Sequence, residues 1–165
     1  MPATGTLPAT IGALLKENVH LGVDAADKDE LIKRLVGELV SAEEGSDASA
    51  HEVAESVLQR ESLLSTGVGY GVGLPHAKSS LVPETLVLFA TTASPVDFDS
   101  VDGEPVQIVF LMVGPPSRST AHIRILGRVS RILNNEDIRQ RLLESSTVAE
   151  VIEIFESAEA GLKSA

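Results

Sequence analysis

The chain has 165 residues, a formal net charge of −11 and no cysteine. This length suits one domain with a real core, since roughly two-thirds of the unfolded surface can be buried at this size. The acidic balance argues against nucleic-acid binding, which needs Lys and Arg to neutralise phosphates, and the lack of cysteine excludes disulfides, thiolate zinc sites and a cysteine nucleophile.

The first half of the chain predicts a short strand followed by two amphipathic helices. Residues 18–21 form the strand candidate. Asp27 is a plausible N-cap for a helix over about residues 28–40, where apolar residues recur at helical spacing. A second amphipathic helix is predicted over residues 50–61, and residues 41–49 between the two helices are typical of a solvated loop.

Two apolar strands dominate the centre of the chain. Residues 86–92 and 106–113 are rich in Val, Leu, Ile and Phe, which is typical of strands covered on both faces. Residues 101–105 predict the turn between them. The carboxylates of residues 97–102 are dense enough to suggest a metal site, but a solvated turn is the favoured interpretation.

Helices follow the second strand. The predicted caps are Ser119 or Thr120 for a helix to about residue 133, Asn135 for a helix through residue 143, and Thr147 for the last helix. Strands mixed with helices of this length imply a sheet covered on both faces. We expect one domain over residues 7–157, with residues 1–6 and 158–165 frayed.

Arginines gather in one segment of this acidic chain. Residues 118–141 carry six arginines against two carboxylates, and Arg124, Arg128 and Arg131 fall on one helical face. That face could meet an acidic partner. A solvated surface is the favoured interpretation.

No stretch of the sequence approaches the roughly 18 apolar residues that a membrane-spanning helix needs. No N-terminal segment combines basic residues with a sufficiently long apolar run, as a secretory signal would. We therefore expect a cytoplasmic protein with no direct membrane insertion.

The most informative segment runs from Arg60 to His76 and has glycine at positions 67, 69, 71 and 73. Glycines remove side chains from around the histidine, so backbone N–H groups can approach an anion held there. Pro75 stiffens the chain immediately before the imidazole. The alternative is a glycine-rich strand or bulge needed for close packing, with His76 at its end by chance.

The sequence lacks complete motifs for a nucleotide site or a hydrolytic zinc site. The Gly69-x-Gly71 pair lacks the third glycine of a dinucleotide fingerprint, and Lys78-Ser79 lacks the preceding glycine of a P-loop. The histidines at 20, 51, 76 and 122 do not show the helical pairing of a hydrolytic zinc motif. We expect neither a nucleotide, nor a metal, nor another cofactor, and we expect His20 and His51 to be structural or surface residues.

The glycine-rich segment closely resembles the signature of the fructose–mannitol type enzyme IIA domains of the bacterial phosphoenolpyruvate-dependent phosphotransferase system. The residues that carry the resemblance are Arg60-Glu61, Ser65-Thr66-Gly67-Val68-Gly69-x-Gly71-Val72-x-Leu74-Pro75-His76, Ser94-Pro95-Val96-x-Phe98-Asp99, Asp102-Gly103-x-Pro105-Val106, Pro115 and His122-x-x-x-Leu126. Gly73 departs from the alanine usual in the family. The resemblance implies a single three-layer α/β/α sandwich with a mixed central β-sheet, and it is most like the nitrogen-regulatory branch.

The resemblance also implies a set of site residues. His76 would be the phosphorylated nucleophile, with Arg60 neutralising the phosphoryl charge and His122 donating a hydrogen bond to it. The alternatives are an exposed arginine ending a helix and a satisfied core histidine. The remaining phosphate-cradle candidates are Ser65, Thr66 and Gly67.

The same resemblance implies a phosphotransferase that needs no cofactor and takes its phosphoryl group from phospho-HPr or the nitrogen-branch counterpart of HPr. Downstream, a regulatory protein could respond to phosphorylation as a switch, which is the favoured hypothesis. Alternatively, the group passes to the cysteine of a IIB domain for fructose or mannitol uptake. A third alternative is a binding module of the same fold without phosphotransfer.

Overall fold

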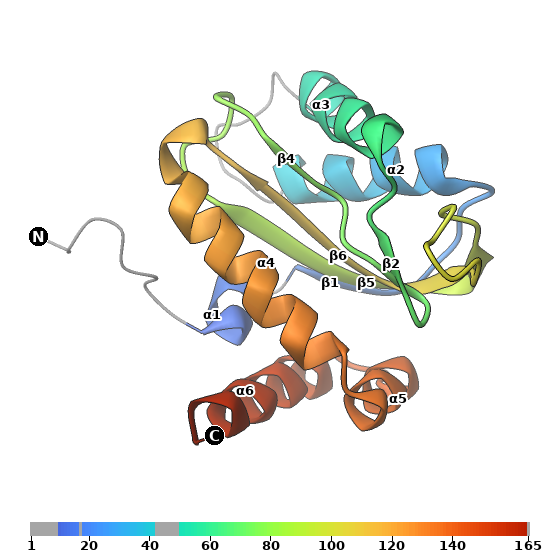
Figure 1. The fold of residues 1–165 in the computed structure, drawn as a ribbon, viewed down its shortest axis with the longest axis vertical. Helices are drawn as coiled ribbons and strands as arrows, with labels where there is room; N and C mark the ends of the chain where they lie inside the picture. Colours follow the sequence, from blue (N-terminus) through green and yellow to red (C-terminus); the bar gives the residue numbers. More distant parts are fainter. Residues whose placement is uncertain (1–9, 17, 42–49, 165) are drawn as a thin grey trace, which may run out of the picture.

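The computed structural model describes residues 10–16, 18–41 and 50–164, which form an α/β domain around a six-stranded mixed sheet (Figure 1). The strand order is β1-β5-β6-β3-β2, and β4 also pairs with β6. The strands are β1 (Val19–Val23), β2 (Gly67–Gly69), β3 (Val72–Gly73), β4 (His76–Lys78), β5 (Leu86–Val96) and β6 (Val106–Gly114). β1 and β5 run parallel, as do β3 and β6 and β4 and β6, whereas β5 and β6 are antiparallel.

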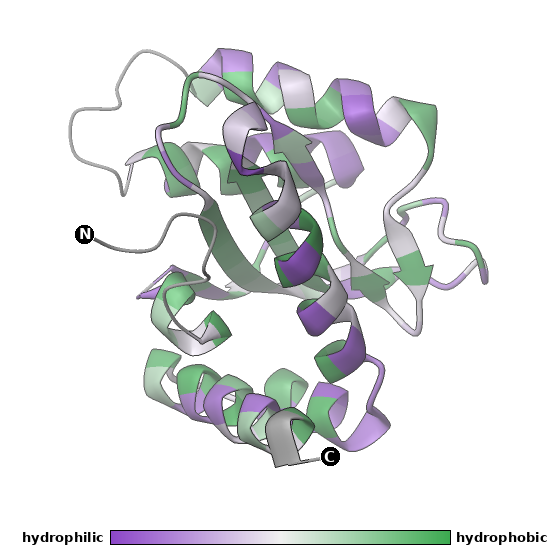
Figure 2. Ribbon diagram, turned by 60° about the vertical axis from the view of Figure 1, so that its left-hand side comes forward, coloured by the Kyte–Doolittle hydropathy of each residue, from purple (hydrophilic) through white to green (hydrophobic). Residues whose placement is uncertain are grey.

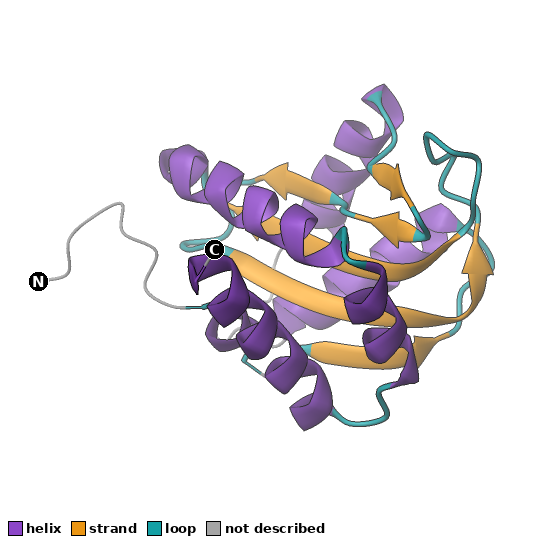
Figure 3. Ribbon diagram, turned by 60° about the horizontal axis from the view of Figure 1, so that its bottom comes forward, coloured by secondary structure: helices purple, strands orange, loops and turns teal. Residues whose placement is uncertain are grey.

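Helices cover both faces of this sheet, so the predicted three-layer fold is confirmed (Figure 3). They are α1 (Ile11–Leu15), α2 (Lys28–Ser41), α3 (Ala50–Leu63), a 3₁₀ turn (Pro116–Arg118), α4 (Ser119–Leu133), α5 (Glu136–Glu144) and α6 (Val148–Ser164). Among the described residues, no helix has the length and apolar character needed to cross a membrane.

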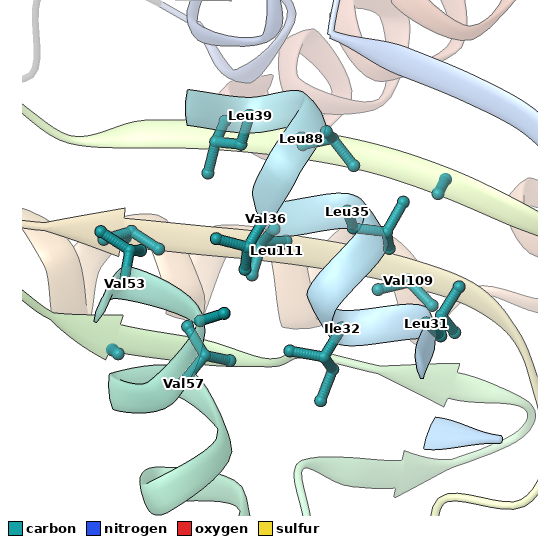
Figure 4. Packing of buried hydrophobic residues seen from close by; sticks show 14 of the residues in the cluster. Leu31, Ile32, Leu35, Val36, Leu39, Val53, Val57, Leu88, Val109 and Leu111 are labelled. Carbon is teal, nitrogen blue, oxygen red and sulfur yellow. The ribbon is translucent and has the colours of Figure 1, made fainter. Parts of the chain in front are cut away.

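Alternation along the two long strands divides the core into two layers. Leu88 of β5 and Leu111 of β6 face α2 and α3, where Leu35, Val36 and Val53 pack against them (Figure 4). The neighbouring strand residues point the other way, toward α1, α4, α5 and α6. The central strands are therefore apolar along their length, whereas the helices carry apolar and polar stripes (Figure 2).

Three of the predicted helix caps are confirmed. Asp27 accepts a hydrogen bond from the Glu30 amide, Asn135 from that of Ile138 and Thr147 from that of Glu150, at 2.9, 3.1 and 3.2 Å. The cap predicted for α4 is wrong. Ser119 is the first helical residue there, and its hydroxyl donates to the Pro116 carbonyl, because the preceding 3₁₀ turn already leads the chain into the helix.

Residues 158–164, which belong to the segment expected to fray, form the end of α6, which continues to Ser164. In this part of the helix the buried carboxylate of Glu159 binds Arg128 of α4 at 2.8 Å and the Ile11 amide of α1 at 2.6 Å. This also gives Arg128 a partner within the chain. Residues 1–6, and residues 42–49 of the predicted loop, lie outside the described residues.

The glycine-rich segment forms three short strands that the sequence did not predict as such. β2 and β3 make an antiparallel hairpin, after which β4 aligns with β6 so that His76 lies opposite Met112. A Cβ atom at Gly73 would lie 2.9 Å from the Phe98 ring. The departure from alanine at position 73 thus makes room for a buried aromatic side chain.

Candidate functional site

His76 begins β4 and is presented with one ring nitrogen already engaged. Its Nδ1 lies 2.7 Å from the carbonyl oxygen of Leu74. A carbonyl only accepts hydrogen bonds, so Nδ1 carries the proton and Nε2 keeps a free lone pair. The side chain is half-buried, and Nε2 is the nitrogen available for chemistry.

His122 comes from the first turns of α4, on the opposite wall of the site. The Pro115-Pro116 pair ends β6, and the chain enters α4 next to the end of β4. The centroids of the His122 and His76 rings are 5.8 Å apart, with 60° between the ring planes. A Cβ atom at Gly114 would lie 3.2 Å from the Nδ1 of His122, so glycine there lets the ring approach.

The His122 side chain is unusual because it is buried without a partner. The residue is 3% exposed, and neither ring nitrogen has a hydrogen-bond partner among the described residues. An unpaired buried polar group is costly, so the alternative of a satisfied core histidine is not what the structure shows.

Arg60 and Lys78 supply positive charge to the same pocket. Arg60 lies in the last turn of α3, and its Nη1 donates to the Leu64 carbonyl at 2.8 Å. Lys78 lies two residues after His76 on β4, which places both side chains on one face of the strand. We did not predict Lys78 as a site residue, although the period of a strand starting at His76 would have indicated it.

These residues line an open pocket of about 790 Å³. They come from β4 and from the helices α3 and α4 on its two sides (Figure 1). The pocket is lined by Ser56, Gln59, Arg60, Ser62, Leu63, His76, Ala77, Lys78, His122, Ile123 and Leu126. The structure therefore brings together His76, Arg60 and His122, which the sequence had placed far apart in the chain.

Both imidazoles are held neutral. Burial lowers the pKa of His76 from its ordinary value, and the charges of Arg60 and Lys78 lower it further, against the opposing effects of the Leu74 hydrogen bond and the Glu61 charge. Burial, followed by the charges of His76 and Lys78, lowers the pKa of His122 to about 4. Near pH 7 the pocket thus offers two uncharged imidazoles beside two cations, which suits an anion.

Ser65, Thr66 and Gly67 are placed differently from the predicted cradle. The Ser65 hydroxyl donates to the Phe98 carbonyl and accepts from the Gly67 amide. The amide and hydroxyl of Thr66 both donate to Glu61, at 2.8 and 2.6 Å. These groups are used within the loop, and the three residues lie outside the set that lines the pocket.

The other candidates lie away from this pocket. His20 is in β1, opposite Ala90 of β5, and His51 is exposed near the start of α3. In the carboxylate-rich turn, Asp102 accepts hydrogen bonds from the amides of Tyr70 and Glu104. Within the described ranges, no group of three or more His, Asp or Glu side chains lies close enough to hold a metal ion.

Fold and site together define a small α/β domain with a histidine-centred pocket lined by cations. The family described as "Phosphoenolpyruvate-dependent sugar phosphotransferase system, EIIA 2" matches residues 13–158. The chain belongs to this family, which confirms the resemblance inferred from its sequence.

Relatives of the chain carry both transport and regulatory names. It is 35% identical to a fructose-specific EIIA component of Haloferax volcanii (83% of this chain, 92% of the relative). It is 40% identical to a nitrogen regulatory protein of Bradyrhizobium diazoefficiens (68% and 74%). It also matches a fructose-specific EIIABC component of Bacillus subtilis at 33% identity (86% of this chain), but spans only 22% of that protein.

Solved structures show the same fold. Nitrogen regulatory protein IIA-Ntr of Neisseria meningitidis superposes with a TM-score of 0.81 at 31% identity, covering 88% of this chain and 98% of that one. Mannitol enzyme IIA from Escherichia coli, solved in a complex with phosphorylated enzyme IIB, gives 0.72 at 25% identity, covering 86% and 96%.

Proposed function

We propose that the protein is a phosphocarrier of the phosphotransferase system whose His76 accepts a phosphoryl group on Nε2. The observation that carries this proposal is the free Nε2 lone pair of a neutral imidazole, held in an open pocket beside Arg60 and His122. The donor is the phosphohistidine of HPr or of its nitrogen-branch counterpart. Family membership supports a role in phosphotransfer, and the geometry supports His76 as its site.

The transfer step balances without an added proton. A P–N bond forms at the Nε2 atom of His76 while the P–N bond of the donor breaks, and its electron pair stays on the donor nitrogen. The proton stays on Nδ1 throughout, in its hydrogen bond to the Leu74 carbonyl. No covalent help is needed from other side chains, because a loose phosphoryl transition state is stabilised mainly by alignment and by charge.

The phosphoryl charge is stabilised in different ways by Arg60, Lys78 and His122. The guanidinium fork of Arg60 suits two phosphoryl oxygens, while Lys78 acts as a point charge on the same side as the nucleophile. A neutral His122 has one N–H to donate to a phosphoryl oxygen, which would satisfy a group that is otherwise buried and unpaired.

For the downstream step we propose a regulatory role, in which the added charge of about −1.5 to −2 changes which partners bind the pocket rim. The likeness to nitrogen regulatory proteins supports this role. Passage of the group to a IIB domain is the second candidate, favoured by the fructose-specific relatives and by the mannitol IIA–IIB complex.

The test is incubation with phosphoenolpyruvate, enzyme I and HPr, followed by measurement of acid-labile, base-stable phosphate on the protein. We expect label on the wild type and on His51→Ala, an exposed-histidine control, and none on His76→Ala because the nucleophile is gone. Label that persists on His76→Ala refutes the assignment. Chasing the labelled protein with IIB domains then separates uptake, in which the label moves to a cysteine, from regulation.

A further inference from the structure

Glu61 is a buried carboxylate to which the phosphotransfer scheme gives no part. The residue is 4% exposed, and it lies outside the set of residues that lines the pocket. Its two oxygens accept hydrogen bonds from the Thr66 amide and the Thr66 hydroxyl and an ion-pair contact from Lys28 at 3.2 Å. Burying a carboxylate is expensive unless donors surround it, so this arrangement stabilises a particular geometry of Thr66.

The hydrogen bonds continue from Thr66 to the nucleophile. The Leu74 amide donates to the Thr66 carbonyl at 3.0 Å. The carbonyl of the same Leu74 accepts the bond from Nδ1 of His76 at 2.7 Å. Thr66 is thus held by Glu61 on one side and holds Leu74 on the other. An unbroken series of contacts joins a buried ion pair in the α2–α3 layer to the imidazole in the pocket.

We infer that Glu61 is a positioning residue for His76: through Thr66 and Leu74 it fixes the carbonyl that holds the proton on Nδ1, and it thereby keeps the Nε2 lone pair aimed into the pocket. This inference rests on the proposed function. A displacement of the carbonyl by about 1 Å would release the ring to rotate or to change tautomer, and misplacement of that size is enough to cost about 100-fold in rate.

The effect of Glu61 on the position of His76 can be separated from its effect on the protonation of His76. Its negative charge raises the pKa of His76, while burial, Arg60 and Lys78 lower it. Removing the charge therefore lowers the pKa of His76 further, and the imidazole stays neutral near pH 7. A loss of rate in a Glu61 variant consequently does not come from protonation of the nucleophile.

The main test uses Glu61→Gln, which keeps the shape but places an amide N–H₂ against donors. The matched control is Glu55→Gln, an exposed position on the same helix with the same change of charge. We expect Glu61→Gln to lower the rate at saturating phospho-HPr by roughly 10-fold to 100-fold with KM within about twofold, and Glu55→Gln to leave both near wild type.

A second readout needs no phosphoryl donor. Nitrogen-15 NMR of the histidines should show one tautomer for His76 in the wild type, with Nδ1 protonated, and a mixture of tautomers in Glu61→Gln. This measurement tests the inference even if the wild type takes up no label. The absence of label would refute the proposed function instead. A folded Glu61→Gln protein with the wild-type tautomer and the wild-type rate overturns the inference.

If Glu61→Gln does not fold, variants of Thr66 test the inference instead. Thr66→Val removes the hydroxyl that donates to Glu61 but keeps the amide donor, and Thr66→Ser keeps both. We expect Thr66→Val to mix the His76 tautomers and lower the rate several-fold, with Thr66→Ser restoring both. Equal behaviour of the two variants contradicts the proposed connection.

Discussion

The two walls of the pocket differ in how complete they are before any ligand arrives. On the β4 wall, His76 is bonded to Leu74, and the loop behind it uses its polar groups internally. On the α4 wall, His122 is buried with both ring nitrogens unpaired among the described residues. One wall fixes the imidazole of His76 in advance, whereas the other lacks an acceptor that an anion can supply.

This contrast separates positioning from ligand recognition. Changes on the β4 wall should impair the orientation of the nucleophile. Changes on the α4 wall should impair stabilisation of the transferred group while relieving the folded protein of an unsatisfied group, since such a group costs about 1–3 kcal/mol. The charge of Lys78 lowers the pKa of the histidine on each wall, whereas the charge of Arg60 lowers that of His76.

Replacing Arg60 should have the largest effect on the pocket as a whole. We expect Arg60→Met to lower the rate of phosphoryl acceptance by about 100-fold or more, because a preorganised cation at the developing charge is lost. Arg60→Lys should recover part of that loss but not the bidentate contact.

Rates of labelling and thermal melts of both Arg60 variants would be compared with Arg141→Met, a variant on α5 away from the pocket. The Arg60→Met protein should lose only about 1 kcal/mol of stability through its Leu64 hydrogen bond. Losses of the same size in rate and in stability would point to an arginine that merely ends the helix.

Replacing His122 should sharpen the contrast most directly. His122→Leu removes the unpaired imidazole, so we expect equal or higher thermal stability at pH 7 together with a roughly tenfold slower phosphoryl acceptance. A variant that loses stability at pH 7 would show that His122 is a satisfied core residue.

The same variant should change how stability depends on pH. The pKa of His122 is lowered to about 4 in the folded protein, from an ordinary value of 6.5. The unfolded chain therefore binds the extra proton first, and stability is lost as the pH falls from about 6.5 toward about 4. Thermal melts at pH 7 and pH 5 should show a smaller drop for His122→Leu than for the wild type.

Replacing Lys78 should have the smallest effect on rate. We expect Lys78→Met to slow phosphoryl acceptance by up to about fivefold, because the residue is exposed and its charge is screened. Since the Lys78 charge lowers the pKa of both histidines, NMR titration should show both pKa values rising. Lys33→Met, on the exposed face of α2, serves as the control. Unchanged titration of both histidines would remove Lys78 from the site.

The sequence predicted the helices and strands that local residue patterns determine. The apolar runs of residues 86–92 and 106–113 became β5 and β6, and the caps at Asp27, Asn135 and Thr147 mark real helix starts. It missed α1, which has only five residues and too few turns to show a helical period. It also missed the short strands of the glycine-rich segment, because their pairing with β6 is a tertiary event.

Three residues of the candidate pocket were named from the sequence, but their contacts were not. His76, Arg60 and His122 were identified through a family resemblance, and they do meet in one pocket. Thr66 was a candidate for the phosphate cradle, and its hydroxyl donates to Glu61 instead. Sequence spacing shows which donors lie near His76, but only the folded chain shows which of them are already occupied.

The bond between Arg60 and the Leu64 carbonyl has a consequence for the energetics of transfer. Immobilising a free arginine side chain costs up to about 2 kcal/mol in rotational entropy. Here part of that entropy is lost when the domain folds, while Arg60 still lines the pocket. In the proposed transfer, a phosphoryl group would therefore bind a cation that has less rotational entropy to lose than a free arginine side chain.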